Sequence, residues 1–61
     1  MDETDAVVSR VREALIRTAL EAYADASMQG LCAEGAWEAA VSAMRRLDLR
    51  LAVADLPPTA R

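Results

Sequence analysis

Residues 19–44 decide the fold, and they read ALEAYADASMQGLCAEGAWEAAVSAM. Alanine recurs through this stretch on both sides of Gly30, and alanine has the highest helix propensity because it loses no side-chain entropy. Gly30 can take the left-handed backbone conformation that ends many helices. We therefore expect two helices joined by a tight turn, packed antiparallel through contact surfaces rich in alanine.

The first helix is expected over residues 4–28, because no Gly or Pro interrupts this range and Thr4 or Asp5 can cap its start. Its apolar residues follow one another at spacings of three and four, as one face of a helix requires. A second stripe runs beside the first, so the apolar face is wider than contact with one neighbouring helix needs. The first stripe is Val8, Val11, Leu15, Ala19, Ala22 and Ala26, and the second is Ile16, Leu20, Tyr23 and Ser27.

The second helix is expected over residues 32–48, after a turn at residues 29–31. Gly35 weakens its first turn by about 1 kcal/mol relative to alanine, so we expect another backbone or the Trp37 ring to pass close to it. A longer loop, with the helix beginning at Ala36, is the alternative. The predicted inward face is Trp37, Ala40 or Val41, Met44 and Leu47, with Ala36, Ala40 and Ala43 on its flank.

Residues 49–56 are expected to form a short arm, which is either extended or a helical continuation of the second helix. Pro57 and Pro58 end any helix, and residues 57–61 are expected to be disordered. At 1.5 Å per residue the second helix is too short to cover the first one completely. Either the arm or a second chain is expected to cover the apolar N-terminal third of the first helix, at Val7, Val8 and Val11.

The composition indicates a small domain, residues 1–56, that does not complete its own core. Chains of this size bury only about 60% of their unfolded surface. Cys32 is the only cysteine and histidine is absent, so neither an intrachain disulfide nor a structural zinc site is available. Yet 54% of the residues are hydrophobic, which is typical of a folded chain. We expect an all-α hairpin that forms a homodimeric four-helix bundle or joins a larger protein assembly. The candidate interface residues are Val8, Val11, Leu15, Ala22, Trp37 and Met44.

Charge and targeting signals exclude several classes of partner. The net charge is −3, and the nearest approach to a basic stripe, Arg45, Arg46 and Arg50, is interrupted by Asp48, so we expect no nucleic-acid binding. No apolar run approaches the ~20 residues of a membrane span, and the acidic start is unlike a signal peptide. A free cysteine fits a reducing compartment. We expect a soluble, cytoplasmic protein of bacterial type.

No catalytic constellation, phosphate-binding loop or metal-ligand spacing is present, so we expect neither an enzyme nor a metal or cofactor site. The leading hypothesis is a small interaction protein, such as an accessory subunit, adaptor or regulator. One alternative is a dimeric ligand-binding or cofactor-binding bundle, with an interface cavity lined by Trp37, Met44 and Tyr23. A further alternative is a redox-responsive module acting through Cys32, whose ordinary role would be a small buried side chain at the turn.

Overall fold

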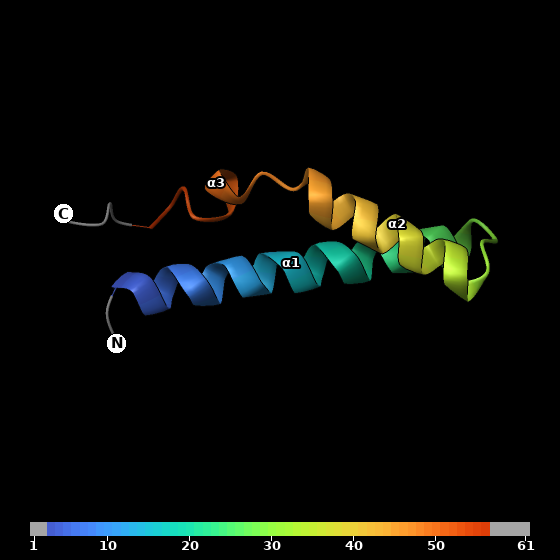
Figure 1. Ribbon diagram of the computed structural model, residues 1–61, viewed down its shortest axis with the longest axis horizontal. Helices are drawn as coiled ribbons and strands as arrows, with labels where there is room; N and C mark the ends of the chain where they lie inside the picture. Colours follow the sequence, from blue (N-terminus) through green and yellow to red (C-terminus); the bar gives the residue numbers. More distant parts are fainter. Residues whose placement is uncertain (1–2, 57–61) are drawn as a thin grey trace.

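A computed structural model describes residues 3–56, and this part of the chain is a helical hairpin with a short third helix (Figure 1). The elements are α1 (Glu3–Met28), α2 (Ala33–Arg46) and α3 (Leu49–Ala52). Helix α2 packs antiparallel on the C-terminal part of α1, which confirms the predicted all-α hairpin. The radius of gyration is 14.3 Å, whereas a compact chain of this length has about 10.5 Å. The hairpin is therefore elongated, and much of its surface faces solvent.

The turn between α1 and α2 has the geometry predicted from Gly30. Its φ of 96° is left-handed, and Gly30 N–H donates to the Ser27 carbonyl at 3.0 Å. The next amide, Leu31 N–H, donates to the Ala26 carbonyl at 3.1 Å. This pair of bonds is the Schellman motif, which satisfies carbonyls that the last turn of a helix leaves without partners. The motif fixes the direction in which the chain leaves α1 and allows α2 to return along it.

Helix α2 begins at Ala33, so the predicted alternative of a loop extending to Ala36 is wrong. The expected neighbour of Gly35 is also wrong, because the three heavy atoms nearest to an added Cβ all belong to Leu31 and not to another backbone or to the Trp37 ring. A Cβ atom at Gly35 would meet the Leu31 side chain, with Cδ2 at 3.4 Å. The Leu31 side chain thus lies against the first turn of α2.

The two helices touch through their smallest side chains. The buried residues in the described part of the chain are alanines, and in α2 they are Ala36, 0% exposed, and Ala40, 1% exposed. In α1 the buried residues are Ala14 and Ala26. The sequence interpretation placed Ala36 on the flank of α2, which is wrong, whereas it named Ala40 both for the flank and, as the alternative to Val41, for the inward face. Small side chains let helix backbones approach closely, and this contact sets the rotation of α2 about its own axis.

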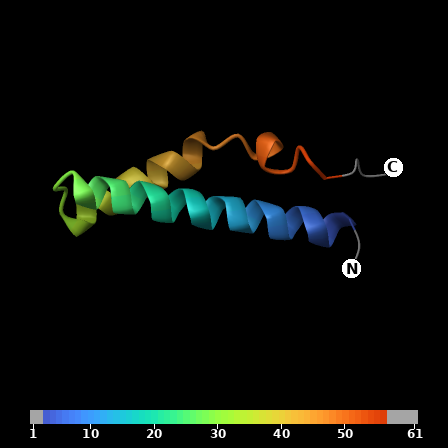
Figure 2. The ribbon, with the colours of Figure 1, turned by 180° about the vertical axis from the view of Figure 1, so that it is seen from behind.

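Helix α2 ends at Arg46, two residues before the predicted boundary, because Asp48 starts a new helical turn. The Asp48 carboxylate accepts a hydrogen bond from Arg50 N–H at 3.0 Å and caps α3. The arm at residues 49–56 is therefore helical at first and then turns. It lies along the N-terminal half of α1, as Figures 1 and 2 show from opposite sides, and Arg10 forms an ion pair with Asp55. The arm thus supplies cover that α2 is too short to give; the predicted disordered tail, residues 57–61, lies outside the described residues.

Candidate interaction surface

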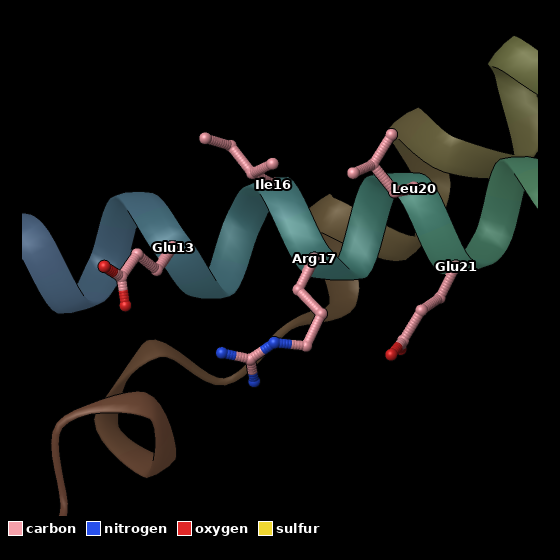
Figure 3. Close-up of a pocket in the computed structure, with 5 residues that line it drawn as sticks. All are labelled: Glu13, Ile16, Arg17, Leu20 and Glu21. Carbon is pink, nitrogen blue, oxygen red and sulfur yellow. The ribbon is translucent and has the colours of Figure 1, made fainter.

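The side of α1 that faces away from α2 carries a shallow hollow of about 480 Å³. Its lining residues recur at spacings of three and four and so belong to a single face of one helix. They are Glu13, Ile16, Arg17, Leu20 and Glu21 (Figure 3). Leu20 lies two positions from the half-buried Ala22, about 200° around the helix axis, so it points away from α2.

Apolar and charged side chains occupy opposite edges of this hollow. In Figure 3, Ile16 and Leu20 rise from one edge of α1, while the three charged side chains extend from the other. Ile16 is 51% exposed and Leu20 66% exposed. In the described residues no ion pair joins Arg17 to Glu13 or Glu21, although a Glu13–Arg17 pair is the spacing a helix favours. The charges are therefore available to a partner.

A second hollow, of about 490 Å³, lies on the exposed side of α2. It is lined by Trp37, Glu38, Val41, Ser42 and Arg45, all from this one helix. Trp37 is 57% exposed, so the prediction that it lies in the core is wrong. The reason is the alanine contact: with Ala36 turned toward α1, the next residue points about 100° away. Trp37 thus presents a large aromatic surface to solvent.

The structure separates the six predicted interface residues into two groups. Val8 and Trp37 are exposed and available to another chain. The others are half-buried in the hairpin itself, and they are Val11, Leu15, Ala22 and Met44. The predicted second stripe of α1, by contrast, is the more exposed one. The sequence analysis recognised that the apolar face of α1 is wider than one neighbouring helix needs. It did not connect this width with the charged residues beside it, Glu13, Arg17 and Glu21, whose spacing of four residues was the available signal.

Cys32 is exposed, so the prediction that it is a small buried side chain at the turn is wrong. It is the N-cap residue of α2, and its side chain makes no capping hydrogen bond. Its carbonyl accepts a bond from Ala36 N–H at 2.8 Å, so the backbone alone begins the helix. A redox role for the thiol stays a prediction.

Two further features of residues 3–56 bear on the kind of site they can form. No helix in this range is long and apolar enough to cross a membrane. No three side chains among the cysteine, aspartate and glutamate residues of this range gather where they could hold a metal ion together. The residues predicted to line a ligand cavity do not share one hollow, because Trp37 lines the hollow on α2 whereas Tyr23 and Met44 line neither of these two hollows.

The comparisons with known proteins identify no relative of this chain. No family model matches the chain, and no curated protein and no solved structure matches it either.

Proposed function

We propose that this chain is a non-enzymatic interaction protein that acts by self-association, with two hairpins forming a four-helix assembly. One observation carries the proposal. In the described residues, the buried side chains are alanines, while Leu20 and Trp37 are more than half exposed. The usual distribution of side-chain size between core and surface is thus inverted, which is typical of a chain whose apolar surface meets another chain.

The energetics of burial support this reading. Alanine has little apolar area to remove from water, so the contact between α1 and α2 yields a small hydrophobic contribution. Complete burial of a leucine or tryptophan side chain is worth about 1.5–3 kcal/mol or more, and most of that gain is unrealised for Leu20 and Trp37. Domains of this length commonly need a disulfide, a metal or oligomerisation to be stable. With a single cysteine and no histidine, oligomerisation is the available route.

The shape of the two hollows favours protein binding over small-molecule chemistry. Each is lined by one helix only. Small-molecule sites instead bring a few polar groups together inside a concave cleft. A partner helix, with its own ridge of side chains, fits such a shallow surface better.

The test is molar mass by light scattering across a concentration series, with helicity followed by circular dichroism in the same samples. We expect a mass near twice 6.6 kDa at high concentration and loss of helix on dilution, because the folding unit is the dimer. A helical monomer at every concentration would refute self-association. A poorly helical monomer would also refute it, and would favour folding on a different protein.

A further inference from the structure

We propose that two copies of this chain pack α1 against α1 in antiparallel orientation, with the twofold axis level with Ala19, Leu20 of each copy beside that axis, and Arg17 of each copy paired with the partner's Glu21. This inference rests on the self-association proposed above. It specifies the face and the register through which the two hairpins meet.

The face is the hollow on the back of α1. Helix α2 covers the opposite side, where Ala14 and Ala26 are buried. Ile16, Leu20 and Tyr23 follow at spacings of four and three, as in the seam between two packed helices. All three are exposed in the single chain. An unpartnered seam of this kind fits another helix.

The charges beside the seam decide the orientation. They run in the order acid, base, acid at Glu13, Arg17 and Glu21. In a parallel twofold pair the two copies of this charged flank lie on opposite sides of the seam, so these charges do not pair with each other. In an antiparallel twofold pair, an axis level with Ala19 sets Arg17 level with the partner's Glu21, and symmetry repeats the pair. Both ion pairs then form from residues that make none with each other in the single chain.

The same axis also aligns the apolar side chains. It places Leu20 beside the partner's Leu20, and it brings Ile16 within one residue of the level of the partner's Tyr23. The competing register, with the axis level with Leu15, pairs Arg17 with the partner's Glu13 but sets Leu20 level with the partner's Arg10. Charge pairing and apolar contact therefore agree only for the axis at Ala19.

The test is a pair of charge-reversal variants, Arg17→Glu and Glu21→Arg. Each variant alone sets like charges together twice in its homodimer, and we expect its dimer Kd to rise about tenfold. Mixed in equal amounts, the two variants restore both ion pairs, so in native mass spectrometry the heterodimer exceeds the half of all dimers that random pairing gives. Mixing leaves the charges within each chain unchanged, so this readout is independent of any effect on the isolated helix.

Glu38→Arg tests the competing surface at Trp37. The matched control is Glu34→Arg, which makes the same charge change as Glu21→Arg at an exposed position of α2 that lines neither hollow. We expect its dimer to keep the wild-type Kd. A dimer Kd unchanged in both charge-reversal variants of α1, or a mixture without excess heterodimer, would overturn this register while self-association stands. A dimer weakened only by Glu38→Arg would place the interface at Trp37 and overturn it too. A wild-type monomer at every concentration would overturn both proposals.

Discussion

The alanine contact between α1 and α2 predicts that a larger side chain at Ala40 destabilises the fold. Ala40 is 1% exposed in the middle of α2, where the two helices lie close together. Leucine adds three carbon atoms at a position that its surroundings close to solvent. Leucine and alanine have similar helix propensities, so Ala40→Leu tests the space between the helices and little else.

The expected loss is large for a protein of this size. Overpacking a filled contact costs about 1–3 kcal/mol. A single core in so short a chain supplies only about 3–5 kcal/mol. Because each kcal/mol changes Tm by about 4–8 °C in domains of this size, we expect Ala40→Leu to lower Tm by roughly 10 °C.

The assay is thermal unfolding followed by far-ultraviolet circular dichroism at a fixed protein concentration. Ala33→Leu is the control, because Ala33 lies in the same helix and is exposed. Its stability should stay within about 0.5 kcal/mol of the wild type. Equal Tm values for the two variants would show that the helices are not in close contact at Ala40, and the assignment of the contact face would fail.

Three further predictions concern the turn and the arm. Gly35→Ala should raise stability in urea unfolding by about 0.5–1 kcal/mol, since helix propensity rises and the added Cβ lies at van der Waals distance from Leu31. Gly30→Ala should lower stability by about 1 kcal/mol, because φ is left-handed at this position. A Gly30→Ala variant more stable than Gly35→Ala would contradict the turn geometry. Cys32→Ser should raise Tm, because a serine hydroxyl can cap α2 where the thiol makes no bond; an unchanged or lower Tm would count against this. Asp48→Ala should speed trypsin cleavage after Arg50, measured by mass spectrometry, with little change in Tm, because the cap holds only the four-residue α3.

The helices and their connection follow from local sequence signals. Apolar spacing and the absence of Gly or Pro determine α1, and Gly30 determines where it ends. These signals act within a few residues, so a single sequence contains them in full. The end of α2 was less accessible, because Asp48 can either continue a helix or cap a new one, and tertiary packing of the arm on α1 decides between them.

The rotation of α2 could not be predicted because the helix carries two adjacent apolar stripes. One contains Trp37, Val41 and Met44, and the other contains Ala36 and Ala40. Hydrophobicity favours burial of the first stripe, whereas close approach of the backbones favours the second. The outcome depends on the distance between the helices, which is a property of the pair and not of either sequence segment alone. The candidate site on α1 was missed for a different reason: its apolar stripe was predicted to meet a further neighbour, but the charged residues beside that stripe were not considered with it.

Close packing through alanine and exposure of the large apolar side chains are two consequences of one choice of contact face. Neighbouring residues on a helix point about 100° apart, so turning Ala36 toward α1 turns Trp37 outward. A hairpin packed through Trp37 would bury more apolar area within one chain, but it would hold the helices further apart and leave less apolar surface for a partner. The alanine contact therefore lowers the stability of the isolated hairpin and leaves more apolar surface with which it can bind a partner. On the self-association proposal, most of the hydrophobic stabilisation belongs to the dimer, and Tm should rise with protein concentration.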